Sequence, residues 1–242
     1  MSKLKLFTVL LTTALLAAFV LPVLAVTYSP GVVSGQYVKY SNFVGVGPGV
    51  ELFNDYDWLK LQVTDVSGKA VTLLSTSQYK NGTAIAGNGT ISVWNIETGT
   101  QDGVPSTQGP IIASNLNSGD SIPPPNTYAV NRTESRTYLG VSRVVNILDA
   151  SLSTPDYNAT LTYVYDKASG MLLESTTQTT TQAQPQPVTT TISYSIIETN
   201  VFGSTLNPSP SVPELPLLAV GVVFVIVLIG VVAVIVLTKK RK

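Results

Sequence analysis

The sequence predicts an all-β fold for residues 26–202, either an antiparallel sandwich or a strongly curved sheet. Three segments alternate apolar and polar residues with the period of two that half-buried strands show. These segments are residues 58–63, 160–165 and 191–197. Turn sequences such as 65–68 and 166–170 follow two of them. From residue 26 to residue 205 the sequence contains no convincing amphipathic helix pattern.

Further strands are expected where β-branched and aromatic residues gather between turn residues. In chain order they are 35–40, 71–75, 83–86, 90–96, 128–148 and 171–175. Segment 71–75 is expected to return from 58–63 as a hairpin, and Gly140 is expected to form a bulge within 128–148. The alternation also predicts the core residues Leu59, Leu61, Leu161, Tyr163, Ile192 and Tyr194.

Four segments are expected outside regular strands. Residues 43–54 are rich in glycine and 97–126 are rich in glycine and proline, so both predict irregular backbone. Within the second, 110–116 can form a short helix with proline at its first position. Residues 176–191 are rich in threonine and glutamine and are interpreted as a long hairpin loop, open to O-linked sugar. Residues 203–214 are rich in proline and predict a semi-rigid stalk.

The two ends of the chain predict export and anchoring. Residues 1–25 carry Lys3 and Lys5 before an apolar run and end in Ala25, which is typical of a cleaved signal peptide, with an uncleaved signal anchor as the alternative. Residues 217–237 carry no charge and would span about 31 Å as a helix, at roughly 1.5 Å per residue. We therefore expect a transmembrane helix over 215–238 and a cytoplasmic basic tail over 239–242, with residues 26–202 outside the cell.

Composition excludes several chemistries. The chain contains neither Cys nor His, which excludes a cysteine nucleophile, a Ser-His-Asp triad and an ordinary zinc site. Six of the 14 Lys and Arg residues lie in the two end segments, and the remaining eight face 14 Asp and Glu, a net charge of −6. A mildly acidic outer part argues against binding to nucleic acid. No cofactor and no metal are expected.

Four asparagines satisfy the acceptor pattern for N-linked glycans, in which Asn is followed by any residue except Pro and then by Ser or Thr. They are Asn81, Asn88, Asn131 and Asn158. Asn81 and Asn88 precede glycine and therefore also predict turns, which are exposed. The turn and the glycan acceptor are compatible interpretations.

Other candidate sites compete with plain structural roles. The side-chain oxygens of residues 54–57 have two interpretations. They form part of a calcium-binding loop, or they cap a turn. The acids Asp57, Asp149, Asp156, Asp166 and Glu174 are available for glycoside hydrolysis, but nothing in the sequence brings two of them together. Trp58, Trp94 and the ten tyrosines from Tyr37 to Tyr194 can form a sugar-stacking face, or they fill a core.

The C-terminal end, Val212-Pro-Glu-Leu-Pro216 followed by an apolar span and Lys-Lys-Arg-Lys, resembles the sorting tails of archaeal surface proteins. Leu215 stands where that family has Phe. The resemblance implies cleavage by an archaeosortase-type transpeptidase and transfer to a lipid, as the alternative to a retained helix. Segments 114–120 and 165–170 also resemble uncharacterised archaeal secreted domains, which offer no assigned activity to carry over.

These observations together predict a membrane-anchored cell-surface glycoprotein that is not an enzyme. The first interpretation is a non-catalytic structural or adhesive domain. The alternative is a module that binds glycans or lipids, and a carboxylate-based glycoside hydrolase is the third. The expected partners are the lipid bilayer, through the C-terminal helix, and surface glycans or other surface proteins.

Overall fold

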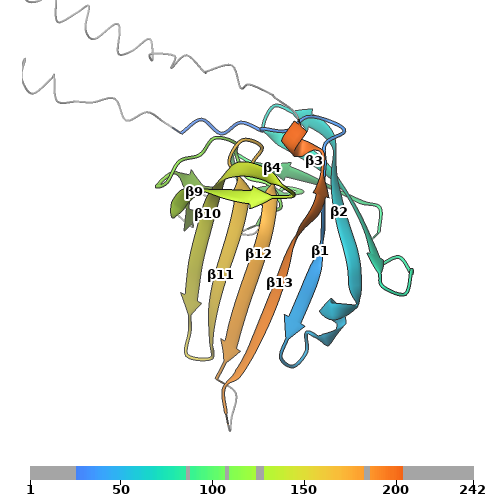
Figure 1. The fold of residues 1–242 in the computed structure, drawn as a ribbon. Coiled ribbons are helices and arrows are strands. Elements are labelled where there is room, and N and C mark those ends of the chain that lie inside the picture. The colour runs from blue at the N-terminus through green and yellow to red at the C-terminus, as the bar shows by residue number, and fades with distance from the viewer. Residues whose placement is uncertain (1–25, 86–87, 107–108, 124–127, 183–185, 204–242) are drawn as a thin grey trace, which may run out of the picture. The chain divides into compact units, whose positions relative to one another are not determined.

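The computed structural model describes residues 26–85, 88–106, 109–123, 128–182 and 186–203. They belong to one compact unit, which has its own hydrophobic core (Figure 1). The expected signal peptide, the transmembrane segment, the basic tail and the stalk beyond Gly203 lie outside the described residues. Among the residues that are described, no helix has the length and apolar character needed to cross a membrane.

Antiparallel strands make up most of this unit, as predicted. The strands are β1 (Tyr37–Val46), β2 (Tyr56–Ser67), β3 (Ala70–Tyr79), β4 (Thr90–Asn95), β5 (Thr100–Gln101), β6 (Val104–Pro105), β7 (Ser121–Ile122), β8 (Tyr128–Ala129), β9 (Arg132–Tyr138), β10 (Val141–Ser153), β11 (Tyr157–Asp166), β12 (Leu172–Thr181) and β13 (Val188–Thr199). Two short 3-10 helices accompany them, η1 (Glu51–Asp55) and η2 (Val201–Gly203).

Eleven of these strands form a single sheet in the order β6-β5-β4-β3-β2-β1-β13-β12-β11-β10-β9. The sheet consists of two meanders, β1 to β6 and β9 to β13, and every neighbouring pair is antiparallel. The ladder between β1 and β13 joins the meanders through pairs such as Tyr40 with Ile196. Strands from the two ends of the unit therefore meet at the centre of the sheet.

The sheet is strongly curved, as Figure 1 shows. Trp94 of β4 and Leu148 of β10 line the same small cavity of about 20 Å³. Seven strand spacings separate these two strands in the sheet order, which would be about 34 Å in a flat sheet at roughly 4.8 Å per strand. Of the two predicted architectures, the curved sheet is therefore the one that forms.

The connection between the two meanders runs from β6 to β9, and we call it the crossover. Its described residues fill one end of the concave face. Ile111, Ile112, Leu116 and Ile122 from this crossover are buried in the core. The expected short helix over 110–116 is wrong, because the backbone instead bonds in extended form to the turn between β11 and β12. The Ile112 amide donates to the Gly170 carbonyl, and the Leu172 amide donates to the Pro110 carbonyl, both at 2.9 Å.

The threonine-rich segment 176–191 is not the long loop that its composition predicted. Residues up to Thr181 extend β12, and residues from Val188 begin β13. The two strands pair directly, for example Thr179 with Thr190 and Thr180 with Thr189. Threonine is β-branched and fits a half-exposed pleated surface, so its β propensity decides the structure despite the polar composition.

Three smaller expectations also differ from the structure. Gly140 is not a bulge: together with Leu139 it forms the tight turn between β9 and β10, with φ angles of 50° at Leu139 and 78° at Gly140. The expected loop 43–54 contains the end of β1 and the helix η1. The expected strand 83–86 reduces to one isolated bridge, from Gln78 to Ala84.

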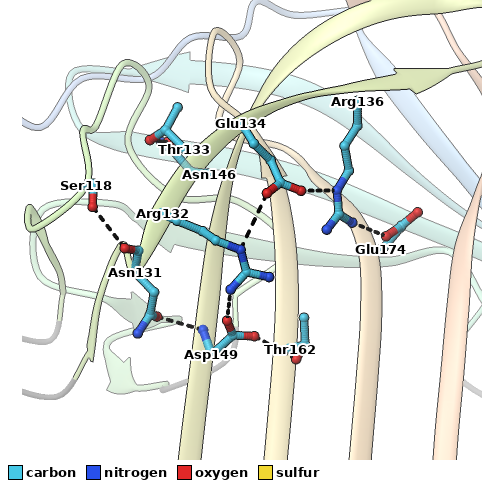
Figure 2. A network of polar contacts seen from close by, with 10 residues as sticks. All are labelled: Ser118, Asn131, Arg132, Thr133, Glu134, Arg136, Asn146, Asp149, Thr162 and Glu174. Carbon is cyan, nitrogen blue, oxygen red and sulfur yellow. Dashed lines mark hydrogen bonds and ion pairs between the residues drawn. The ribbon is translucent and has the colours of Figure 1, made fainter.

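The β9–β10 hairpin bends back over the convex face of the sheet, and Figure 2 shows the polar contacts that hold it there. Arg136 of β9 lies 3.1 Å from the Glu174 carboxylate of β12, although β10 and β11 separate the two strands in the sheet. Arg136 also donates to Glu134 at 2.6 Å, and Arg132 contacts Glu134 and Asp149. The fold-back buries Val145 and Ile147 on the outer face.

Among the glycines of the turns, Gly170 is the one at which substitution is expected to destabilise the domain most. Its φ is +76°, and an added Cβ would collide with the carbonyl oxygen of Ile112 in the crossover. We expect Gly170→Ala to lower the free energy of unfolding by about 1–2 kcal/mol from the left-handed backbone and by roughly a further 1–3 kcal/mol from the collision. Urea unfolding monitored by circular dichroism measures the change.

Gly68, in the turn between β2 and β3, is the matched control. Its φ is +59°, and an added Cβ would meet nothing within 4 Å. Gly68→Ala should therefore lower the free energy of unfolding only by the cost of the left-handed backbone, about 1–2 kcal/mol. Equal losses for the two variants would mean that the crossover does not press on the β11–β12 turn.

The predicted core residues divide into two groups. Leu161 and Tyr163 are buried, with exposed fractions of 8% and 5%. The other four are half-buried: Leu59, Leu61, Ile192 and Tyr194. All four occupy inner positions of their strands, so the alternation assigned their face correctly. Their partial exposure has a common cause, which is a cavity on the concave face.

Candidate functional site

A cavity of about 410 Å³ lies on the concave face of the sheet. This volume falls within the range of roughly 300–1,000 Å³ that is usual for small-molecule sites. The walls come from β1, β2, β11, β12 and β13, with η1 at one side and the crossover at one end. The lining residues are Tyr40, Phe53, Leu59, Leu61, Gly109, Pro110, Tyr163, Leu172, Ser175, Thr177, Ile192 and Tyr194.

Small residues on β12 create the hollow. Ser175 pairs with Tyr163 on one side and Tyr194 on the other, so a small side chain stands between two large ones. Thr177 pairs with Ile192 in the next inner row. Because side chains two residues apart share a face of a strand, Ser175 and Thr177 leave adjacent gaps on the inner face. The gaps lie beside Leu59 and Leu61 of β2 because the sheet curves.

An aromatic cluster forms one wall of the cavity. The ring of Tyr194 lies 5.4 Å from that of Tyr40, 5.7 Å from Phe43 and 6.3 Å from Phe53, measured between ring centroids. Phe43 and Phe53 meet edge to face at 5.2 Å. These separations lie in the range in which aromatic pairs attract each other, so this wall of the cavity is well packed.

Buried tyrosine hydroxyls tie the sheet to the rim of the cavity. The Tyr40 hydroxyl donates to the Leu172 carbonyl at 2.9 Å, and the Tyr165 hydroxyl donates to the Gly109 carbonyl at 3.0 Å. Burial raises the pKa of Tyr40 and Tyr165 well above the usual value for tyrosine. Burial also raises the pKa of Tyr163 to about 12. These side chains are therefore neutral at physiological pH.

We expect the domain to lose stability as the pH rises from 10 to 12. Burial is the main cause that raises the pKa of both Tyr163 and Tyr138 from 10.0 to about 12. The contribution of these two tyrosines to the free energy of unfolding is complete below pH 10, where their hydroxyls are protonated in both the folded and the unfolded state. This contribution is lost as the pH rises towards 12. Each pKa unit corresponds to about 1.4 kcal/mol.

Urea unfolding at pH 8, 10 and 11 measures this dependence, and Tyr163→Phe is the control because it removes the hydroxyl. The variant should lose less stability between pH 10 and pH 11 than the unmodified domain. A free energy of unfolding that stays constant to pH 11 would contradict the prediction.

The structure does not bring the candidate acids together as a hydrolytic pair. Asp149, Asp166 and Glu174 each contact an arginine, namely Arg132, Arg143 and Arg136 respectively. All three lie on the convex side of the sheet or at a turn, away from the lining of the cavity. Asp57 and Asp156 are exposed, and both accept hydrogen bonds through their backbone carbonyls. The part of the chain that the structure describes therefore offers no carboxylate pair in the cavity.

The candidate calcium segment 54–57 has a structural role. The Asn54 side chain accepts from the Gly45 amide at 2.7 Å and donates to the Gly45 carbonyl at 2.9 Å, which closes the loop before η1. Its two nearest acids are exposed. Across the described ranges no group of three acidic side chains is placed to hold a metal ion.

The two tryptophans do not share a sugar-binding face. Trp58 lies on the convex side, where the Lys39 ammonium sits 4.9 Å from its ring centroid. Trp94 is buried on the concave side, against the crossover. Tyr37 is also on the convex side and carries Lys60 over its ring at 4.0 Å. Of the candidate aromatic residues, only Tyr40, Tyr163 and Tyr194 line the cavity of about 410 Å³ on the concave face.

The four glycan acceptor candidates share one arrangement. Each asparagine is exposed. Each uses its Oδ1 as an acceptor, and among the described residues none donates a hydrogen bond through Nδ2. Asn81 accepts from Thr83, Asn88 from the Ser77 amide, Asn131 from the Asp149 amide, and Asn158 from the Ser153 hydroxyl. Nδ2 is the atom to which an N-linked glycan attaches, so the fold leaves all four available.

Glycosylation at these positions stays a prediction, and intact mass tests it. In a host that adds N-linked glycans, about half of the four sites are expected to be occupied. Each occupied site should lose one glycan mass when its asparagine is replaced by glutamine. An unchanged mass for all four single variants would contradict the prediction.

Sequence reasoning missed Ser175, Thr177, Gly109 and Pro110 as parts of a site. The small size of Ser175 and Thr177 between large neighbours becomes visible when the strands are aligned in register. Gly109 and Pro110 come from a crossover whose path the sequence does not reveal. In comparisons with known proteins, no family model matches the chain, and no curated protein matches it either.

Proposed function

We propose that this chain is a membrane-anchored cell-surface protein whose β domain binds a hydrocarbon-bearing ligand in the concave cavity. The observation that carries the proposal is a cavity of about 410 Å³ lined by aliphatic and aromatic side chains. Export and anchoring rest on the signal peptide and the apolar C-terminal segment that the sequence predicts. The cavity favours ligand binding over a purely structural or adhesive role.

The chemistry of the lining favours a hydrocarbon over a glycan. Sugars are polar, so binding them in a buried site requires hydrogen-bonding side chains that replace lost contacts with water. The cavity offers Ser175, Thr177 and tyrosine hydroxyls, and the described residues that line it include no amide or carboxylate side chain. The Tyr40 hydroxyl is already bonded to the Leu172 carbonyl. Leu59, Leu61, Ile192 and the aromatic wall are suited to methylene groups.

A chain-length series of linear alcohols tests the proposal. Residues 26–206 form a compact unit with its own core, so this unit can be studied without the predicted anchor. Each buried methylene is worth about 0.8 kcal/mol, which corresponds to roughly fourfold in Kd. Titration calorimetry from hexanol to hexadecanol should show affinity that rises by about this factor per carbon and then levels off when the cavity is full.

Water-soluble oligosaccharides serve as the comparison in the same assay. We expect no measurable binding for them. Saturable oligosaccharide binding without alcohol binding would favour a glycan module instead. The absence of any binding would leave the structural or adhesive interpretation.

A further inference from the structure

The charged side chains of the domain are sorted away from the cavity. Eight Lys and Arg residues lie within the described part of the chain, and none lines the cavity: Lys39, Lys60, Lys69, Lys80, Arg132, Arg136, Arg143 and Lys167. On β1, Lys39 alternates with the inward-facing Val38 and Tyr40, so it lies on the convex face. Lys60 of β2 pairs with it there.

Each of the remaining cations is held elsewhere. The three arginines contact acids on the outer side of the β9–β12 region. Lys80 donates to the Asn54 carbonyl at 2.6 Å, and Lys167 donates to the Asn117 side chain at 2.8 Å. Lys69 donates to the Tyr28 carbonyl. Among the described residues, the cavity therefore has no cation in its walls to pair with a carboxylate or phosphate, and no Asp or Glu to pair with an ammonium group.

The polar groups near the cavity are hydroxyls. Ser175 and Thr177 line it, and Thr179 continues the same inner face of β12 by strand alternation. Thr179 pairs with Thr190 of β13, and both are half-buried. The inner face thus passes from aromatic and aliphatic residues to threonine along β12 and β13. A hydroxyl row can both donate to and accept from an uncharged polar group.

We infer that the ligand is an uncharged amphiphile, with its hydrocarbon portion among Leu61, Tyr163 and Ile192 and its hydroxyl-bearing head beside the threonines of β12 and β13. This inference rests on the proposed function and adds the ligand class. Transfer of an unpaired charge into an apolar site is strongly unfavourable. Carboxylate and phosphate groups are normally bound by Arg or Lys. An uncharged head avoids both requirements.

Three ligands with the same ten-carbon chain separate the possibilities: decanol, decanoate and decyltrimethylammonium. Titration calorimetry of the 26–206 unit at neutral pH should show decanol binding, with both ions at least tenfold weaker. Decanoic acid should bind more tightly as the pH falls through its own pKa, because the acid then becomes neutral. If either ion binds as tightly as decanol, the inference of an uncharged ligand is overturned while the hydrocarbon site stands. If none of the three binds, the proposed function fails with it.

A charge placed at the head position gives an independent test. Thr179→Lys should tighten decanoate binding by at least tenfold, because the new ammonium pairs with the carboxylate. Gln178→Lys is the matched control, since Gln178 is the exposed neighbour on the opposite face of the same strand. The control should leave decanoate binding unchanged. Equal gains in both variants would mean that decanoate binds outside the cavity, and the inference would be overturned.

Discussion

Asp166→Asn is expected to lower the free energy of unfolding by about 3–5 kcal/mol. The Asp166 side chain is fully buried, and Arg143 binds it with two hydrogen bonds of 2.8 Å each. The amide and hydroxyl of Ser169 also donate to it, at 2.9 Å and 2.7 Å. An asparagine at this position leaves the Arg143 guanidinium, stacked 4.8 Å from the Phe202 ring, without its counter-charge.

The position of Asp166 in the fold explains why the loss should be large. Asp166 ends β11 and begins the turn against which the crossover packs. Asp65→Asn is the control, because Asp65 is exposed on β2. Urea unfolding should show a change within about 0.5 kcal/mol for the control. Similar values for the two variants would show that the buried ion pair does not hold this turn.

Ile192→Trp is expected to weaken decanol binding by more than tenfold while the domain stays folded. Ile192 lines the cavity and is half-buried, so a larger side chain can occupy the part of the cavity that we assign to the ligand. The loss of two or more buried methylenes is worth about 1.6 kcal/mol, which corresponds to more than tenfold in Kd. Titration calorimetry measures the affinity, and circular dichroism measures the fold.

Thr191→Trp is the matched control for the filled cavity. Thr191 is the neighbour of Ile192 on β13, and its side chain takes the opposite face of the sheet by strand alternation. Its decanol affinity should equal that of the unmodified domain. Equal weakening by the two substitutions would place the binding site elsewhere.

Much of the fold could be predicted because alternation is a local signal. Segments 58–63, 160–165 and 191–197 lie within β2, β11 and β13, and the turns at Gly68 and Gly170 were anticipated. The threonine-rich parts of β12 and β13 were not predicted because their low hydrophobicity favours a loop, whereas in the structure the β-branching of threonine outweighs it. The path of 110–116 was missed because its hydrogen-bond partners lie about 60 residues away in the sequence.

The site was harder to predict than the strands. Tyr163 and Tyr194 could be assigned to inner faces, but a fully packed core and a cavity give the same alternation. The difference depends on Ser175 lying between them across two ladders, and on Leu59 approaching from the far side of a curved sheet. Both features depend on the tertiary structure, so the alternation of residues along a strand does not reveal them. The absence of Cys and His excluded several classes of enzyme, but it carried no information about a cavity or about the ligand that we propose for it.

The proposal that a hydrocarbon-bearing ligand binds in the concave cavity is tested most directly by mapping where the ligand lies. A fatty alcohol that carries a photoreactive diazirine in its chain should be crosslinked to the 26–206 unit, and the labelled peptides should be identified by mass spectrometry. We expect labels on the inner-face residues Leu61, Tyr163 and Ile192, and excess decanol should suppress them. Labels confined to the convex face, for example at Trp58 or Lys60, would show that the ligand does not bind in the cavity.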